Sequence, residues 1–281
     1  MVSLPSPGGT APGPIQPIPL RPRLWLIAGT GEGPPLARRL LQRGWRLRVS
    51  VVTAAAAQAY GEHPALQIRI GALGRSTGDD GSTALQDTLE AACRQHDPFH
   101  WVVDASHPFA VRISAALARV CQARQQPLLR LQRPLLPSGR ARLLSSIGEL
   151  GYCCRPGEAL LLAIGARHLG EAIAACPQAR HHGRVLPYPT ALRQALAAGL
   201  RGDRLACLRP GTMAEPIEAA LCRRWGIETV LTRQSGGESE ARWHRHCQAL
   251  NLRLLLLRRP EEPPGVTLLP MDALLDQLGT P

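Results

Sequence analysis

Short apolar runs alternate with amphipathic helical patterns from Arg23 to the end of the chain. In the first half, strands are expected over residues 23–28, 45–52, 67–70, 100–104 and 127–131, and helices over 34–43, 82–96 and 111–124. The second half repeats this rhythm, with strands expected over 159–164, 180–186, 204–208, 228–232 and 252–257, and helices over 165–175, 190–198, 213–225, 238–250 and 271–278. Turns rich in Gly, Pro or Ser separate these segments.

This alternation predicts an α/β fold made of two Rossmann-like halves with mostly parallel sheets and an interdomain cleft. We expect an N-terminal Rossmann-like domain over residues 23–135 and a C-terminal α/β domain over 136–281, with 132–142 as the crossover. Residues 1–22 are rich in Pro and Gly and lack the apolar core of a signal peptide, so they predict a disordered tail and a cytoplasmic protein. No apolar run reaches membrane-spanning length, so no membrane association is expected.

The chain of 281 residues carries a net charge of +12, and all 33 of its basic residues are arginine. The absence of lysine excludes Schiff-base chemistry and a Walker-type phosphate site. The arginines are scattered and aromatic residues make up only 4% of the chain, which disfavours a nucleic-acid-binding protein. Ordinary solvated arginines are the simplest interpretation, and a polyanionic small substrate is the other, because guanidinium groups bind carboxylates in bidentate geometry.

Neither the cysteines nor the histidines predict a metal site. The eight cysteines form no C-x-x-C pair, and most lie within apolar patterns, so buried free thiols are expected. His244 and His246 are two residues apart and would not share a helix face. No metal is therefore expected.

The first turn, Gly29-Thr30-Gly31-Glu32-Gly33, lies where a nucleotide-binding fold keeps its phosphate loop. It does not match G-x-G-x-x-G, so an ordinary tight turn is an equally good interpretation. An NAD site requires an acid at the end of the second strand, yet residues 50–60 contain none, and Arg46 and Arg48 lie on that strand. A dinucleotide bound here is therefore expected to be the phosphorylated form.

The most polar turn follows the run that ends at Asp104, and it reads Asp104-Ala105-Ser106-His107-Pro108-Phe109. A Ser/His hydrolase pair is disfavoured because no G-x-S-x-G elbow is present. Asp104 or Ser106 could cap the next helix and also contact a ligand. Phe109 could line the cleft, although core packing is the simpler expectation.

Two further segments end at the same expected cleft. Arg130 and Arg133 flank the crossover and are candidates for carboxylate binding, or equally for ordinary solvated arginines. Ser235-Gly236-Gly237 forms a glycine turn at a strand end in the second half, where it could face a ligand or be a plain turn.

Taken together, these turns resemble the precorrin-6A reductase family of cobalamin biosynthesis. Gly29-Thr30-x-Glu32-Gly33 resembles its G-G-T-x-E segment, and Asp104-Ala105-Ser106-His107-Pro108-Phe109-Ala110 resembles its D-A-T-H-P-F-A segment, the most specific match. Further similarities to the family's motifs are found at 129–134 (L-R-x-x-R-P), 183–187, 232–237 (T-K-D-S-G-G) and 258–260 (R-R-P). Arg233 replaces the Lys of T-K-D-S-G-G and keeps its charge, whereas Gln234 replaces the Asp and loses one.

The resemblance implies an NADPH-dependent oxidoreductase that reduces a macrocycle double bond of precorrin-6A or cobalt-precorrin-6A. It implies a polycarboxylated corrin precursor as substrate, with neighbouring pathway enzymes as candidate partners. The implied catalytic residues are His107, as a group that titrates near neutrality, and Asp104. The implied cofactor contacts are Gly29, Thr30, Glu32, Gly33, Ser50, Thr53, Ser106, Ser235, Gly236 and Gly237, and the implied substrate contacts are Pro108, Phe109, Arg130, Arg133 and Arg233. The alternative is a non-catalytic nucleotide- or tetrapyrrole-binding protein of the same fold.

Overall fold

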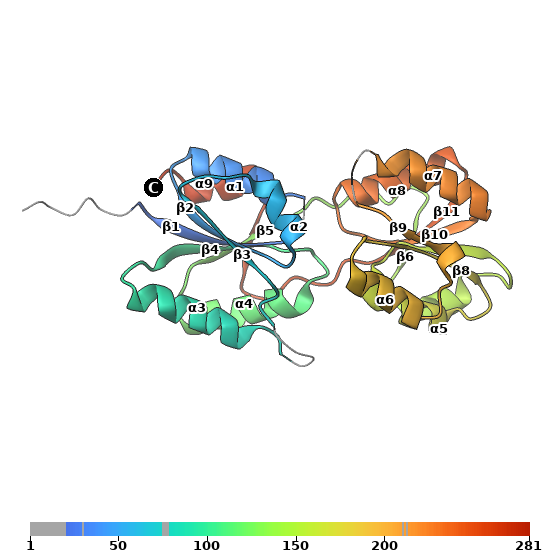
Figure 1. Ribbon diagram of the computed structural model, residues 1–281, viewed down its shortest axis with the longest axis horizontal. Helices are drawn as coiled ribbons and strands as arrows, with labels where there is room; N and C mark the ends of the chain where they lie inside the picture. Colours follow the sequence, from blue (N-terminus) through green and yellow to red (C-terminus); the bar gives the residue numbers. More distant parts are fainter. Residues whose placement is uncertain (1–20, 30, 75–78, 210, 212) are drawn as a thin grey trace, which may run out of the picture.

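The computed structural model contains two three-layered α/β domains side by side (Figure 1). It describes residues 21–29, 31–74, 79–209, 211 and 213–281. Each domain is built on a six-stranded sheet in which every pair of neighbouring strands is parallel. The expected pair of Rossmann-like halves is confirmed. The expected tail lies outside the described residues, except for positions 21 and 22.

The first domain follows the predicted alternation closely. Its elements are β1 (Arg23–Ala28), α1 (Gly33–Gln42), β2 (Arg46–Val51), α2 (Ala54–Ala57), η1 (Gln58–Tyr60), β3 (Leu66–Ile70), α3 (Ser82–Arg94), β4 (Phe99–Ala105), α4 (Val111–Ala123) and β5 (Leu128–Leu131). The sequence pattern did not predict α2 and η1. They form the crossover between β2 and β3, which is required because neighbouring parallel strands cannot be joined by a tight hairpin.

The second domain has the sheet order β6-β11-β10-β7-β8-β9. Its elements are β6 (Arg142–Leu144), η2 (Ile147–Tyr152), β7 (Ala159–Leu162), η3 (Ala166–His168), α5 (Leu169–Ala175), β8 (Arg180–Val185), α6 (Pro189–Ala197), η4 (Gly202–Arg204), β9 (Leu205–Cys207), α7 (Ala214–Trp225), β10 (Thr229–Arg233), α8 (Glu238–Ala249) and β11 (Arg253–Leu257). In Figure 1, α7 and α8 cover one face of this sheet, and α5 and α6 cover the other.

The end of the chain returns to the first domain. Strand β12 (Thr267–Leu269) pairs with β5, which gives the first sheet the order β12-β5-β4-β1-β2-β3. Helix α9 (Met271–Leu278) packs its buried Leu274, Leu275 and Leu278 into the core beneath α1. The expectation that residues 136–281 form one continuous domain is therefore wrong for this last segment, because its apolar face is buried against the first sheet.

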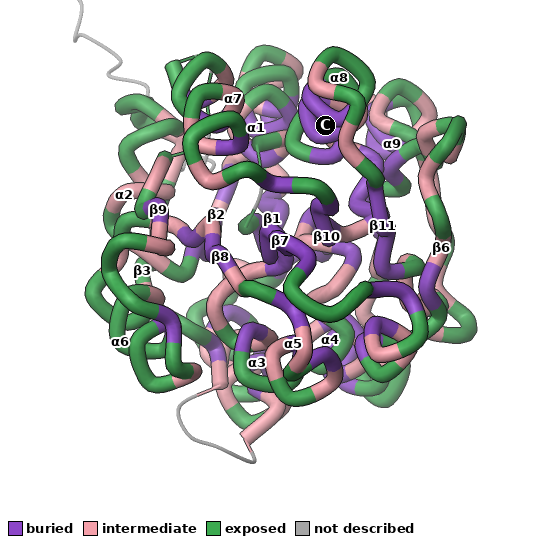
Figure 2. The backbone as a smooth tube through the Cα atoms, turned by 90° about the vertical axis from the view of Figure 1, so that its right-hand side faces the viewer, coloured by how far each residue is buried: buried purple, intermediate pink, exposed green. Residues whose placement is uncertain are grey.

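Alternating side chains of β1 divide the first core into two layers. Leu24 and Leu26 pack with α1 and α9, whereas Trp25 and Ile27 pack with α3 and α4. Figure 2 shows the strands as mainly buried and the outer surfaces of the helices as mainly exposed. The sheets therefore fix the positions of the turns at the strand ends. No helix within the described residues is both long and apolar enough to cross a membrane.

Candidate active site

The turns at the carboxyl ends of strands from both sheets meet between the two domains. Glu32, after β1, and Ser235, after β10, are both bound by Arg133, which follows β5. Phe109, in the turn after β4, packs against the core of the second domain. In open α/β sheets this edge is where ligands bind. The structure therefore brings the polar turns of the two halves together at one junction.

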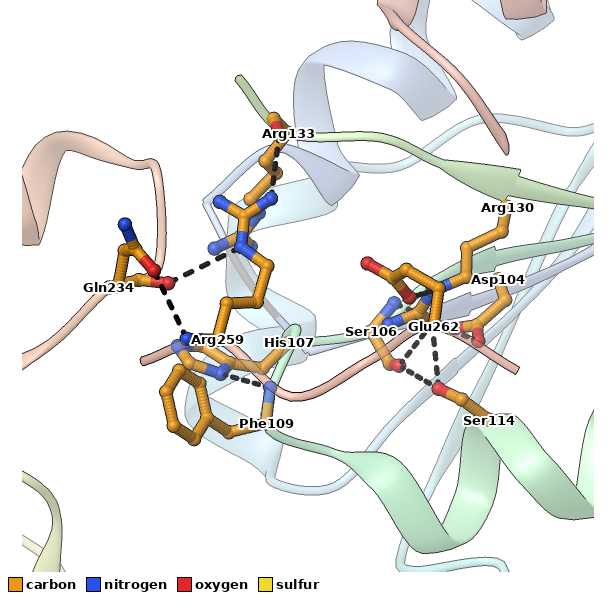
Figure 3. A network of polar contacts seen from close by, with 10 residues as sticks. All are labelled: Asp104, Ser106, His107, Phe109, Ser114, Arg130, Arg133, Gln234, Arg259 and Glu262. Carbon is orange, nitrogen blue, oxygen red and sulfur yellow. Dashed lines mark hydrogen bonds and ion pairs between the residues drawn. The ribbon is translucent and has the colours of Figure 1, made fainter. Parts of the chain in front are cut away.

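Asp104 belongs to a network of polar side chains behind this junction, and it forms a buried ion pair there (Figure 3). One carboxylate oxygen accepts the backbone N–H of Ser106 at 2.9 Å, and the other pairs with Arg130. Arg130 also donates to the hydroxyl of Ser114 at 2.6 Å and pairs through Nε with Glu262. Asp104 and Arg130 are only 2% and 3% exposed, so neither side chain is open to a ligand, whereas the side chain of Glu262 at the other end of the network is 24% exposed.

This burial changes the roles expected for three residues. Asp104 and Arg130 neutralise each other inside the domain, which does not fit direct catalysis by Asp104 or direct substrate binding by Arg130. The hydroxyl of Ser106 lies 3.2 Å from that of Ser114 and so turns inward, away from a cofactor. Neither Asp104 nor Ser106 caps α4, whose N-cap residue is Ala110. All three residues hold the shape of the turn that carries His107.

His107 is neutral at physiological pH. Burial lowers the pKa of its imidazole to about 3, and the positive charges of Arg133, Arg233, Arg259 and Arg130 lower it further. The backbone N–H of Phe109 donates to Nδ1 at 3.1 Å, so the single ring proton of the neutral imidazole belongs on Nε2. The expectation that His107 titrates near neutrality is therefore wrong, because burial and, to a lesser extent, the four nearby arginines disfavour its charged form.

Phe109 and Pro108 shape the wall of the junction. Pro108 is buried, whereas Phe109 is partly exposed. The Phe109 ring lies 5.7 Å from the His107 ring, and the guanidinium carbon of Arg233 lies 5.0 Å from the Phe109 ring centroid. This cation–π contact joins the first domain to the second. Phe109 was expected either to pack in a core or to line the space between the domains. It packs against the core of the second domain and lies at the junction.

Arg133 and Arg259 fasten the two domains together. Arg133 donates through Nη2 to Glu32 at 2.6 Å and through Nη1 to the carbonyl of Ser235 at 3.4 Å. Arg259 donates to the carbonyls of Arg133 and Pro134 at 2.8 and 3.1 Å, and to the carbonyl of Gln234 at 3.3 Å. Both guanidinium groups therefore hold the junction, and Arg259 forms no ion pair with a carboxylate in the described part of the chain.

Arg233 is the least compensated cation at the junction. No carboxylate pairs with it among the described residues, and its buried Nε has no hydrogen-bond partner there. Burial lowers the pKa of its guanidinium to about 10, with a smaller effect from Arg167. A partly buried cation without a counter-ion is unfavourable, so this position is suited to receive an anionic group.

The two glycine turns differ in the space around them. A Cβ atom at Gly29 or Gly31 would meet no atom within 4 Å, so this backbone is open to a ligand. A Cβ at Gly33 would collide with the hydroxyl of Tyr60, so Gly33 is required for packing. Thr30, an expected cofactor contact, lies outside the described residues.

The second glycine turn is occupied by protein. A Cβ at Gly236 would collide with the carbonyl of Pro134 and the guanidinium of Arg259, and one at Gly237 would lie 3.1 Å from Oε1 of Glu32. Ser235 is buried. This turn is therefore packed against Pro134, in the segment that first connects the two domains. That packing argues against the direct cofactor contacts expected from Ser235 and Gly236.

Ser50 and Thr53 are engaged locally. Ser50 is buried, and its hydroxyl accepts the indole N–H of Trp25 at 2.9 Å. Thr53 Oγ1 accepts the backbone N–H of Ala56 at 3.2 Å and so caps α2. The burial of Ser50 contradicts its expected cofactor contact, whereas Thr53 stays partly exposed at the strand end.

Sequence reasoning missed Arg259 and Glu262 as site residues. Arg259 lies in the terminal R-R-P segment, whose similarity was noted without a role. No motif in the sequence marked Glu262, and its contact with Arg130 joins residues that are 132 positions apart.

A cavity of about 1090 Å³ lies beside the two segments that connect the domains, and His107, Phe109 and Arg233 are not among its lining residues. Its lining includes Glu32, Arg133, Gln234 and Arg259. Within the described part of the chain, no group of three or more His, Cys, Asp or Glu side chains could hold a metal ion, and all eight cysteines are free.

Comparisons with known proteins find relatives that match most of this chain. Residues 23–278 match the family described as precorrin-6x reductase CbiJ/CobK. The cobalt-precorrin-6A reductase of Synechocystis sp. is 34% identical over 250 residues, covering 86% of this chain and 90% of that protein. The precorrin-6A reductase of Mycobacterium tuberculosis H37Rv is 31% identical, covering 87% and 91%.

A solved structure titled CobK precorrin-6A reductase superposes with a TM-score of 0.69, covering 92% of this chain and 96% of that one. At 23% identity, that likeness supports the fold alone. The match over residues 23–278 and the identity to the Synechocystis protein establish the relationship: the chain belongs to the precorrin-6x reductase CbiJ/CobK family.

Proposed function

We propose that this chain reduces a macrocycle double bond of precorrin-6A or cobalt-precorrin-6A with NADPH, in cobalamin biosynthesis. Its curated relatives carry the names of these two activities. The observation that carries the proposal is the junction itself, where the open backbone at Gly29 and Gly31, the neutral His107 and the uncompensated Arg233 lie at the carboxyl ends of two parallel sheets.

The residues after β1 fit the pyrophosphate of a dinucleotide. Gly29 and Gly31 leave room for close approach, and the carboxylate of Glu32, the N-cap residue of α1, is paired with Arg133. When bound, NADPH supplies the hydride. Gly33 acts indirectly, because its contact with Tyr60 sets the start of α1. Glu32 holds Arg133 at the same turn.

Arg233 and Phe109 fit a large conjugated substrate that carries carboxylates. The Arg233 guanidinium offers an unsatisfied donor to a carboxylate, and burial strengthens such a pair. The exposed part of the Phe109 ring offers an apolar face to a macrocycle. Arg133 and Arg259 orient both groups by holding the domains together.

The neutral imidazole of His107 positions substrate and does not serve as a charged acid. Its Nε2–H is a hydrogen-bond donor, and the four arginines around it prevent a second proton from binding near neutral pH. Reduction of a double bond needs a hydride at one carbon and a proton at the next. We assign the proton to solvent and the orientation of the substrate to His107.

The test is an anaerobic assay with purified protein, NADPH and either precorrin-6A or cobalt-precorrin-6A. We expect oxidation of NADPH that depends on one of these macrocycles and is slower with NADH. The non-catalytic alternative predicts NADPH binding with an unchanged absorbance spectrum of both macrocycles. That result would overturn the proposed reduction.

A further inference from the structure

One half of a sheet face in the first domain carries polar side chains and cations in place of a core. Residues of β2 and β3 alternate, so Leu47, Val49 and Val51 enter the core beneath α1. The opposite side of these strands carries Arg46, Arg48 and Ser50 on β2 and Gln67 and Arg69 on β3. On that side, the apolar core under α3 and α4 is built on β1 and β4.

Two of these arginines have no counter-ion among the residues that the structure describes. Arg46 pairs with Asp97, as does Arg23, at the amino ends of the strands. The guanidinium carbon of Arg48 lies 6.0 Å from the centroid of the Trp25 ring. Arg69 donates to the carbonyl of Gly71, at 3.1 Å. Neither Arg48 nor Arg69 forms an ion pair with any residue that the structure describes.

These two cations also repel each other. Burial lowers the pKa of Arg48, and the charges of Arg23 and Arg69 lower it further, so its guanidinium lies within electrostatic reach of Arg69. Both side chains remain partly exposed. A dianion bound between the two guanidinium groups would relieve this repulsion, and it could reach them because both are partly exposed to solvent.

Arg69 lies at the edge of the sheet where the proposed dinucleotide binds. It is the second-last residue of β3, and its hydrogen bond to Gly71 brings the guanidinium past the end of the strand. The register aligns Ile27 of β1 with Ser50 of β2, and Ser50 with Arg69. Arg69 is thus two strand spacings, about 10 Å, from the strand that ends at Gly29.

The end of β2 is where a dinucleotide-binding fold recognises the ribose of the adenosine. An acid there binds the 2′-hydroxyl of NAD, and a nearby arginine accepts the 2′-phosphate of NADP. Residues 50–60 contain no acid, and the hydroxyl of Ser50 is taken by Trp25. Arg48 and Arg69 therefore lie beside this strand end, where an NAD-binding protein would have an acid.

We propose that Arg69, supported by Arg48, binds the 2′-phosphate of NADPH and determines the preference for NADPH over NADH. This inference rests on the proposed function. It assigns the specificity to β3, whereas Arg46, on the strand from which the preference was first expected, is bound to Asp97 at the opposite edge.

The experiment measures dissociation constants of NADP⁺ and NAD⁺ by calorimetry for the wild-type protein and the variants Arg69→Gln, Arg48→Gln and Arg38→Gln. Arg38 is exposed on α1 and serves as the charge-matched control. For Arg69→Gln we expect NADP⁺ binding to weaken by about tenfold to a hundredfold, the range of a lost charge-assisted hydrogen bond, with NAD⁺ changed less than about twofold. Arg48→Gln should give a smaller loss in the same direction, and Arg38→Gln none.

Retained NAD⁺ affinity in Arg69→Gln also reports that the variant is folded. An unchanged ratio of NADP⁺ to NAD⁺ affinity in both Arg69→Gln and Arg48→Gln overturns this assignment while leaving the proposed function intact. If the wild-type protein binds neither nucleotide, the proposed function fails as well. Arg69→Lys keeps the charge and should retain part of the preference.

Discussion

Arg233 combines burial with the absence of a carboxylate partner among the described residues, and this combination distinguishes it from the many solvated arginines of the chain. Replacing it by Gln should lower kcat/KM for the macrocycle by about tenfold to a hundredfold, because a charge-assisted bond is lost. NADP⁺ affinity should change less than about twofold. Steady-state kinetics and calorimetry measure both quantities.

Arg233→Lys tests whether the charge is sufficient, and we expect it to recover part of the loss. Arg193, exposed on α6, provides the control substitution Arg193→Gln. An Arg233→Gln protein with wild-type kcat/KM would remove this residue from the substrate site.

His107 should make stability depend on pH. Its folded pKa of about 3 lies below the ordinary value of 6.5, so between these values the unfolded chain holds a proton that the folded protein refuses. Stability therefore falls as pH falls through this window, by up to about 1.4 kcal/mol per pH unit from this group. His107→Gln should reduce the slope of unfolding free energy against pH by that amount.

Denaturant unfolding at several pH values measures the two slopes. His182, whose pKa burial lowers to about 4, contributes equally to both proteins, so the difference isolates His107. Equal slopes of unfolding free energy against pH in the two proteins would contradict the lowered pKa of His107.

Between elements, the pair of Asp104 on β4 and Arg130 on β5 stabilises the adjacent strands and their turn. Asp104→Asn leaves a buried guanidinium with one fewer anion and should lower the free energy of unfolding by about 3 kcal/mol or more. The matched control is Asp87→Asn, an exposed position on α3, for which we expect less than about 0.5 kcal/mol. Equal losses in the two variants, measured by chemical denaturation, would contradict the proposed role of the network.

Helix α9 stabilises the first domain although it comes last in the chain. Leu275 is fully buried against the core beneath α1. Leu275→Ala should lower the free energy of unfolding by about 2–5 kcal/mol and reduce hydrogen-exchange protection in β1 and α1. Hydrogen-exchange protection lost mainly in the second domain would contradict the packing of α9 on the first domain. Leu192→Ala, at an exposed site on α6, is the control.

Local pattern predicted most of these elements, because each strand and helix carries its own periodicity. The strand expected over 252–257 is Arg253–Leu257, and the helix expected over 271–278 is Met271–Leu278. Strands β6 and β12, of three residues each, were not predicted, whereas the equally short β9 was. The pairing of β12 with β5 connects positions more than a hundred residues apart, which periodicity does not encode.

The candidate site was predicted less completely than the fold. Its turns were located from strand ends and family resemblance, whereas the direction of each side chain depends on distant partners. Asp104 points inward because Arg130 meets it, and Arg130 is held in turn by Glu262. The pKa of His107 depends on arginines from the first crossover, from β10 and from the returning segment.

The molecule as a whole is two domains connected by two crossings of the chain, with Arg133 on the first and Arg259 on the second. Both arginines bind backbone carbonyls of the opposite segment or domain, so the crossings fix the junction on which the site depends. Under the proposed function, a substrate between the domains would be held by groups from both halves.

Transfer of the hydride itself can be observed with NADPH in which both hydrogens at the nicotinamide C4 position are replaced by deuterium. Under anaerobic conditions, we predict that the reduced form of precorrin-6A or cobalt-precorrin-6A gains one deuterium from this cofactor, detected by mass spectrometry. A macrocycle that stays unreduced, or that is reduced without deuterium, would contradict direct reduction by NADPH in this protein.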